Sequence, residues 1–177
     1  MSKYMLKHDE ENCISCLACE VHCKSNKNLD EAGPNPCQII SVGPIDVGGQ
    51  PRMRSVFMPC FHCEDPWCVR ACPTHAMKKR EKDGIVYIES SLCIGCKSCI
   101  AACPWGTVQW DPTTHKAVKC DYCMDRVDAG LKPACVTKCV TGCQSFGEAD
   151  EIPDPRRERY AQFLMAEPTI NDKKEES

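Results

Sequence analysis

Apolar residues in this chain occur in short runs separated by polar and cysteine-rich stretches. The clearest run is GIVYI at residues 84–88, and it directly follows Asp83. An Asp-Gly pair ahead of alternating apolar and polar residues is typical of a β-hairpin turn. We therefore expect a hairpin that turns at Asp83-Gly84 and continues as a strand from Ile85 to Glu89. No run approaches the roughly 18 apolar residues of a membrane helix, so direct membrane insertion is not expected.

The segment after residue 150 has a different pattern. Between Pro155 and Ala166, the spacing of Tyr160, Phe163 and Leu164 predicts a short helix with these three residues on one side. Such a helix has no core of its own. Residues 151–177 are therefore expected to dock onto this chain, a catalytic subunit or a second copy, with a disordered tail from residue 171.

The composition does not describe an ordinary apolar core. The 42% of residues that count as hydrophobic include 18 cysteines, and without them the share falls to about a third. With 13 prolines as well, such a chain needs disulfides or metal to hold it together. The N-terminal stretch MSKYMLKHDEENC has no apolar signal region and no twin arginine. We therefore expect a cytoplasmic protein, in which cysteines bind metal more often than they form disulfides.

The charge of the chain bears on its partners. A formal net charge of −3 gives no support to nucleic-acid binding. The basic run KKREK at residues 78–82 lies on the expected hairpin. A solvated turn is a better interpretation of this run than a docking site for an acidic partner.

Most of the cysteines follow one repeated pattern. Sixteen of the 18 form four groups of four, each beginning with CxxC and ending with a cysteine that is separated from the third by three residues. The groups are Cys13, Cys16, Cys19 and Cys23; Cys60, Cys63, Cys68 and Cys72; Cys93, Cys96, Cys99 and Cys103; and Cys120, Cys123, Cys135 and Cys139. The middle gap widens to four residues in the second group and to eleven in the fourth, and Pro73 and Pro104 follow the second and third groups.

This rhythm is typical of 4Fe-4S clusters. Three cysteines at intervals of two residues let a tight loop wrap one corner of the cluster, and small residues such as Ala18 and Gly95 allow close approach. The fourth cysteine lies where the chain turns into a helix, so it points to a neighbouring cluster. Pairing the groups by their separation along the chain predicts four sites: Cys60, Cys63, Cys68 with Cys103; Cys93, Cys96, Cys99 with Cys72; Cys13, Cys16, Cys19 with Cys139; and Cys120, Cys123, Cys135 with Cys23.

The second and third groups, with a hairpin between them, have the layout of a two-cluster bacterial ferredoxin. The first and fourth groups then pair across this unit. We therefore expect an α+β fold of two interleaved ferredoxin-like units with pseudo-twofold repeats, built from short hairpins and short helices around iron-sulfur clusters. The inserted unit is expected at residues 51–111 and the outer unit at residues 1–50 and 112–150.

Zinc is the main alternative metal. Cys120 and Cys123 followed by Cys135 and Cys139 come near the signature of a zinc ribbon. The other groups lack the spacing of tetrahedral zinc sites, and a disulfide scaffold is disfavoured without a signal peptide. A zinc-bound structural module would be colourless and air-stable, whereas an iron-sulfur protein would be brown and sensitive to oxygen.

The stretches CFHCEDPWCVRACP, CIGCKSCIAACPW and KCDYCMDRVDAGLKPACVTKC resemble the four-cluster electron-transfer subunits of molybdenum or tungsten pterin oxidoreductases. Formate dehydrogenases and the dimethyl sulfoxide reductase group have such subunits. The resemblance covers about residues 10–148. It implies four 4Fe-4S clusters that carry single electrons between a catalytic subunit and an acceptor.

Within that family, CISCLACEVHCKSNKN and GIVYIESSLCIGCKSCIAACPW look most like the small subunit of tungsten aldehyde oxidoreductases. This similarity implies a tungsten-pterin partner that oxidises aldehydes and a flavin subunit that accepts the electrons. A ferredoxin or a second copy of the chain, stacked head to tail, is another expected acceptor. A formate dehydrogenase or dimethyl sulfoxide reductase type of molybdenum enzyme is the alternative partner.

Several positions depart from the family pattern. After Cys139 the family usually has Pro and then Thr-Gly-Ala, whereas this chain has Val140 and ends the motif in Cys143. We expect Cys143 to pack rather than to bind iron. Cys23 also lacks a following Pro, and Cys37 is expected to be an unligated loop or buried thiol.

No catalytic constellation accompanies the cysteines. The sequence has no dinucleotide-binding glycine fingerprint, no phosphate-binding loop and no nucleophile elbow. Sixteen thiolates match four clusters and leave no iron free for a substrate, so the chain is expected to be a non-catalytic subunit of an oxidoreductase. His22, His62 and His75 are expected to be surface or packed residues rather than tuners of cluster potential. The three tryptophans are expected to shield sulfur and to fill core.

Overall fold

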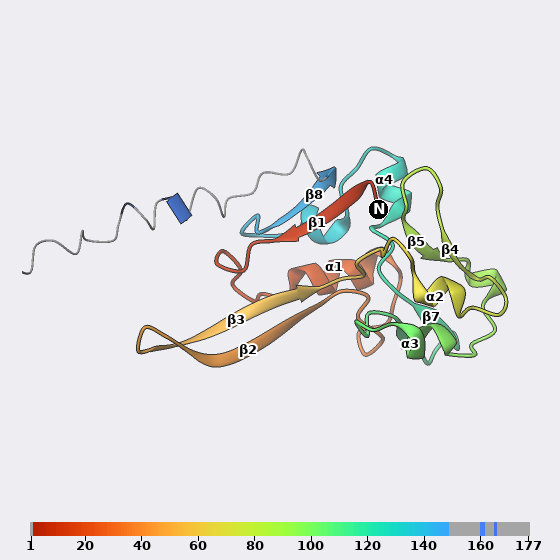
Figure 1. Ribbon diagram of the computed structural model, residues 1–177, viewed down its shortest axis with the longest axis horizontal. Coiled ribbons are helices and arrows are strands. Elements are labelled where there is room, and N and C mark those ends of the chain that lie inside the picture. The colour runs from red at the N-terminus through yellow and green to blue at the C-terminus, as the bar shows by residue number, and fades with distance from the viewer. Residues whose placement is uncertain (1, 149–159, 162–164, 166–177) are drawn as a thin grey trace, which may run out of the picture.

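The computed structural model of this protein describes residues 2–148, 160, 161 and 165. Apart from the last three positions, the expected docking segment at residues 151–177, with its helix and tail, lies outside the described residues. In chain order the elements are β1 (Tyr4–His8), α1 (Ala18–Asn26), β2 (Gln38–Val47), β3 (Gln50–Met58), α2 (Trp67–Arg70), β4 (Met77–Lys79), β5 (Val86–Ile88), the 3-10 turn η1 (Ser90–Leu92), α3 (Ser98–Ala102), β6 (Gln109–Asp111), β7 (Lys116–Val118), α4 (Met124–Asp128), α5 (Ala134–Thr137) and β8 (Gln144–Glu148) (Figure 1).

The strands of the described chain pair as four antiparallel two-stranded ribbons: β1 with β8, β2 with β3, β4 with β5 and β6 with β7. The β1–β8 ribbon joins the two ends of this part of the chain, with Tyr4 opposite Glu148 and His8 opposite Gln144. Beside it, α1 packs against α5. The first and fourth cysteine groups therefore lie in one half of the molecule, although the expected boundaries near residues 51 and 112 stay predictions.

The hairpin expected at Asp83-Gly84 is confirmed. β4 pairs with β5, and Gly84 has a φ of +73°, which glycine adopts at no steric cost. β5 is shorter than the expected strand, but the N–H of Glu89 donates to the carbonyl of Ala76 at 2.7 Å, which extends the ladder by one more hydrogen bond. The Asp-Gly pair and the short apolar run after it were therefore sufficient to predict this element.

The longest ribbon, formed by β2 and β3, was not expected from the sequence. It projects from the body of the molecule and turns at Gly48 and Gly49, which have φ values of +63° and +80° (Figure 1). Two glycines with positive φ suit the tight turn of a two-residue hairpin. At the base of the ribbon, Ile39 lies opposite Phe57 and both are buried. Beyond the base most side chains are exposed, so the strands lack the alternation that predicts a half-buried sheet.

Thiols make up much of the core. In the described part of the chain, three clusters of buried side chains form it, and each cluster joins cysteines from two different groups. They contain Cys19, Cys23, Cys37, Cys135, Ile39 and Phe57; Cys68, Cys99, Met77, Val86, Val108 and Ala117; and Cys60, Cys120, Ile85 and Tyr122. The helices around them are short, and in the described residues none has the length and apolar character needed to cross a bilayer. The fold is thus a small mixed arrangement of ribbons and short helices packed around cysteine.

Candidate metal centres

The four CxxC loops share one backbone conformation. The third residue of each loop has a positive φ: 54° at Ser15, 46° at His62, 72° at Gly95 and 55° at Tyr122. A left-handed backbone costs a residue other than glycine roughly 1–2 kcal/mol, so its use in three such residues indicates a functional constraint. Loops of this kind aim successive N–H groups into a concave nest, which is a common binding site for iron-sulfur clusters.

Two hollows lie between the second and third cysteine groups, and each takes three cysteines from one group and the fourth from the other. Site A is lined by Cys93, Cys96, Cys99 and Cys72, and site B by Cys60, Cys63, Cys68 and Cys103. The exchange is possible because α2 packs against α3, which places the end of each helix beside the loop of the other group. The structure thus brings together the two inner sets that the spacing predicts.

The first and fourth groups meet in the same way. Site D is a hollow lined by Cys13, Cys16, Cys19 and Cys139, with Cys143 as a fifth thiol. Site C consists of Cys120, Cys123, Cys135 and Cys23. All four are buried, and Cys23 and Cys135 belong to one core cluster. Burial and then the charges of the neighbouring cysteines raise the pKa of Cys135. Twelve of the sixteen predicted ligand residues therefore line three hollows in the predicted sets, and the grouping of the four buried cysteines of site C stays a prediction.

The core places the four sites in a row. One core cluster contains cysteines of sites A and B, a second joins Cys60 of site B to Cys120 of site C, and a third contains cysteines of sites C and D. The order is therefore A, B, C, D. Each end of the row has an exposed thiol, Cys96 at site A and Cys16 at site D. Site C is the most enclosed of the four, because all of its four cysteines are buried.

The chemistry of the donors fits iron-sulfur clusters. Burial raises the pKa of Cys19, Cys68 and Cys99 to about 11 and that of Cys120 to about 12. Such thiols remain protonated at neutral pH unless a metal takes the place of the proton. Among the described residues, no carboxylate lines the hollows of sites A, B and D. Sets of soft thiolate ligands select zinc or iron-sulfur clusters, and the spacing favours the latter.

A buried lysine lies at the junction of sites B and C. Lys119 is only 3% exposed, and its Nζ donates to the carbonyls of Val86 and Cys120, the second at 2.6 Å. Burial raises the pKa of Cys68 of site B and of Cys120 of site C, and the positive charge of Lys119 acts in the opposite direction on both. No carboxylate of the described residues forms an ion pair with it. The burial of Lys119 could not be predicted from the sequence, because lysines are seldom buried.

His62 is packed beside this lysine, in agreement with the expectation of a packed residue. Its ring centroid lies 3.8 Å from that of Tyr122, and its Nδ1 accepts the N–H of Val86 at 2.9 Å. The ring proton is therefore on Nε2, which is buried and has no hydrogen-bond partner in the described chain. Burial and then the charge of Lys119 hold the pKa of His62 well below its usual value. An unpartnered buried donor inside a CxxC loop suits a site filled with sulfur acceptors. His22 is half-buried and His75 is exposed.

The two cysteines outside the groups both lie beside predicted ligands. Cys37 is buried, as expected, and its Sγ lies 3.7 Å from the carbonyl oxygen of Cys19. A hydrogen bond from Cys37 keeps the pKa of Cys23 below its usual value. At site D, burial raises the pKa of Cys139, but hydrogen bonds from Cys143 and from the N–H of Gln144 outweigh this effect and lower it. Both extra thiols therefore act on the electrostatics of a site.

The expectation that the tryptophans fill core is wrong for two of them. Trp67 and Trp105 line the hollow of site B but are 55% and 54% exposed. Trp105 makes an edge contact with Phe61, at 5.5 Å between ring centroids, and Phe61 is exposed as well. Both tryptophan rings therefore lie at the rim of the site B hollow and not in the core. Trp110 is half-buried with the ammonium of Lys97 over its ring.

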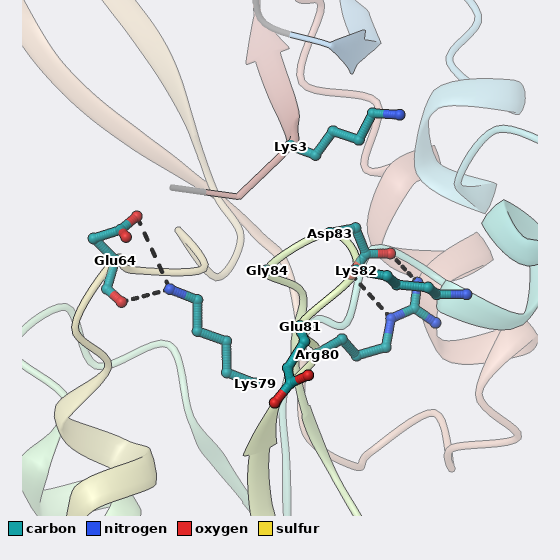
Figure 2. Close-up of a pocket in the computed structure, with 8 residues that line it drawn as sticks. All are labelled: Lys3, Glu64, Lys79, Arg80, Glu81, Lys82, Asp83 and Gly84. Carbon is teal, nitrogen blue, oxygen red and sulfur yellow. Dashed lines mark hydrogen bonds and ion pairs between the residues drawn. The ribbon is translucent and has the colours of Figure 1, made fainter.

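The basic run on the hairpin is paired within the chain. It borders a polar pocket of about 340 Å³ in which Lys79 contacts Glu64 and Arg80 contacts Asp83 (Figure 2). Lys82 and Arg80 also pair with Asp128, both at 2.8 Å. These contacts pair three of the four basic side chains of the run, Lys79, Arg80 and Lys82, within the chain. They do not favour a docking site for an acidic partner, and no cysteine lines the pocket.

Gly95 is the loop position at which a side chain should do most harm. A Cβ there would lie 2.7 Å from the carbonyl oxygen of His115 and 3.1 Å from Cη2 of Trp110. We expect Gly95→Ala to reduce the free energy of unfolding by about 3 kcal/mol and to lower iron content at site A. Gly106→Ala is the matched control. Its φ is similar (+63°), but nothing lies within 4 Å of the added carbon, so it should cost about 1 kcal/mol. Equal losses in the two variants would contradict the steric argument.

Comparisons with known proteins match most of the chain. Residues 52–149 match a family model described as a 4Fe-4S dicluster domain. The chain is 40% identical over 152 residues to the thiosulfate reductase electron transfer subunit PhsB of Salmonella typhi, covering 85% of this chain and 78% of that protein. It is 39% identical over 150 residues to the B subunit of anaerobic dimethyl sulfoxide reductase of Escherichia coli, covering 81% and 73%. It is 37% identical over 173 residues to the B subunit of polysulfide reductase of Wolinella succinogenes, covering 97% and 87%.

Proposed function

Since this chain belongs to the 4Fe-4S dicluster family, we propose that it is the electron-transfer subunit of an oxidoreductase whose catalytic subunit carries a molybdenum or tungsten pterin. One observation carries the proposal: four sets of cysteines lie in a row, and an exposed thiol stands at each end of it. A row of closed sites with exposed ends suits the passage of electrons between two partners rather than the binding of a substrate.

We assign the sixteen cysteines of sites A to D as the ligands of four 4Fe-4S clusters. When bound, each cluster accepts and releases a single electron. The chain itself fixes how close neighbouring sites are. Cys68 and Cys72 belong to sites B and A and are four residues apart, as are Cys19 and Cys23 of sites D and C. One turn of helix therefore spans each of these pairs of sites.

The junction between sites B and C is different, because no such short segment links them. Ile85 and Tyr122 pack there with Cys60 and Cys120. Lys119 lies at this junction, and its charge stabilises negative charge on either side. The assignment also implies the interleaved fold: sites A and B in an inserted ferredoxin-like unit at residues 51–111, and sites C and D in an outer unit at residues 1–50 and 112–150.

The relatives named above belong to thiosulfate, dimethyl sulfoxide and polysulfide reductases. They favour a molybdenum partner of the dimethyl sulfoxide reductase type. The tungsten aldehyde oxidoreductase, which the sequence similarity suggests, is the second candidate, and a flavin subunit would accompany it. A cytoplasmic location and head-to-tail stacking of copies stay predictions from the sequence.

Elemental analysis of the complex, purified from its host without oxygen, tests the function. We expect about sixteen irons on this chain after subtraction of the partner's own clusters, together with stoichiometric molybdenum. Stoichiometric tungsten in place of molybdenum would move the assignment to the aldehyde oxidoreductase. Zinc without iron would contradict the electron-transfer function and support a structural zinc module.

A further inference from the structure

Cys143 is a fifth thiol at site D. Its side chain is 7% exposed, and its Sγ lies 3.4 Å from the Sγ of Cys139. It lines the same hollow as the other thiols of the site. The ligand atoms of Cys143, Cys13 and His8 all lie within 4.8 Å of one another. Cys143 is therefore not an isolated cysteine but a thiol that faces the same centre as the assigned ligands.

A tight turn brings Cys143 to this position. Gly142 has a φ of +67°, and its N–H donates to the carbonyl of Cys139 at 3.3 Å. The chain thus folds back directly after Cys139. The next side chain, that of Cys143, then lies beside the Cys139 sulfur.

The same turn follows the fourth ligand of site B. Gly106 has a φ of +63°, and its N–H donates to the carbonyl of Cys103 at 3.3 Å. Four residues after Cys103, the Oγ1 of Thr107 lies 3.5 Å from the Cys103 Sγ. The corresponding residues after the fourth ligands of sites A and C are Ala76 and Lys27. Among the four sites, only site D has a thiol at this position.

A second observation comes from Gln144, which lines the same hollow and is 4% exposed. Its Nε2 donates to the Nδ1 of His8 at 3.0 Å, and the Nε2 of His8 donates to the carbonyl of Ser55 at 3.0 Å. The Oε1 of Gln144 has no hydrogen-bond partner in the described part of the chain. The buried Oε1 of Gln144 needs a hydrogen-bond donor, and thiolate ligands donate no hydrogen bond. It therefore suits a site in which one of the five sulfurs remains a protonated thiol.

We propose that Cys143 is an alternative ligand of site D, which replaces Cys139 when the Cys139 thiolate leaves the cluster. In this exchange the Fe–S bond to Cys139 breaks and one to Cys143 forms, while the thiol proton of Cys143 passes to Cys139. The iron keeps its oxidation state, so no oxidant or reductant is needed. The inference rests on the proposed assignment of site D to a 4Fe-4S cluster.

The test measures iron per chain in variants of the full chain, purified in its complex without oxygen. We expect Cys139→Ala to keep the wild-type iron content, and Cys139→Ala combined with Cys143→Ala to lose about a quarter of it. The electron paramagnetic resonance spectra of reduced Cys139→Ala and Cys139→Ser should be identical, because Cys143 would be the ligand in both.

Site B provides the matched control. Cys103→Ala has no nearby thiol and should lose about a quarter of the iron, whereas adding Thr107→Cys should restore it. Equal iron content in Cys139→Ala and in the double variant would overturn the proposal, because a substitute ligand at Cys143 must give Cys139→Ala more iron than the double variant. This holds whether both variants fold or both fail to fold. A wild-type chain without iron would instead contradict the proposed function.

Discussion

Removal of iron with an oxidant and a chelator is expected to abolish the folded state of this protein. The three core clusters contain eight buried cysteines between them, and few large apolar side chains accompany these sulfurs. A structural metal site contributes on the order of 10 kcal/mol, which is as large as the whole free energy of unfolding of a typical domain. Without metal, the buried thiols would have to pack as small apolar groups around empty hollows, which is unfavourable.

The measurement is thermal unfolding followed by far-ultraviolet circular dichroism, before and after iron removal. The apo chain should show no cooperative transition and should be cleaved rapidly by a protease. Addition of iron and sulfide under reducing conditions should restore both the transition and the brown colour. A cooperative transition that survives complete iron removal would show that ordinary apolar contacts hold the fold.

Lys119→Met is expected to lower the reduction potentials of the clusters at sites B and C. A buried positive charge stabilises the reduced, more negative form of a nearby cluster. A unit charge about 8 Å away at an effective dielectric constant of about 20 contributes about 2 kcal/mol, or about 90 mV for a one-electron couple. Redox titration followed by electron paramagnetic resonance should therefore show two potentials shifted to more negative values, and the potentials of sites A and D should shift less.

Lys82→Met is the matched control, because it removes the same charge from a side chain that is 63% exposed and pairs with Asp128 on the surface. Water and salt screen such a charge, so its removal should leave all four potentials nearly unchanged. Iron content and circular dichroism establish that both variants are folded. Equal shifts in the two variants would show that the position of Lys119 at the junction has no special effect.

Local spacing explains which parts of the molecule could be predicted from sequence. The CxxC loops and the β4–β5 hairpin depend on residues that are close in the chain. The exchange of fourth cysteines joins distant groups, and it was predicted from the repeat of the cysteine spacing. Four different residues, Ser15, His62, Gly95 and Tyr122, occupy the left-handed position of the CxxC loops. The four loops therefore share their cysteine spacing but not the residue type at this position. The projecting β2–β3 ribbon escaped prediction because most of its side chains are exposed and its faces do not alternate.

The sequence by itself determined the four cysteine groups, the type of cofactor they suit and the class of electron-transfer subunit to which the chain is similar. The tertiary structure decided the order of the sites, the burial of Lys119 between two of them and the approach of Cys143 to Cys139. It also decided that Trp67 and Trp105 stay at the rim. The physical reason is distance along the chain: ligand loops form from neighbouring residues, whereas burial and the contacts between sites depend on segments that meet only when the chain folds.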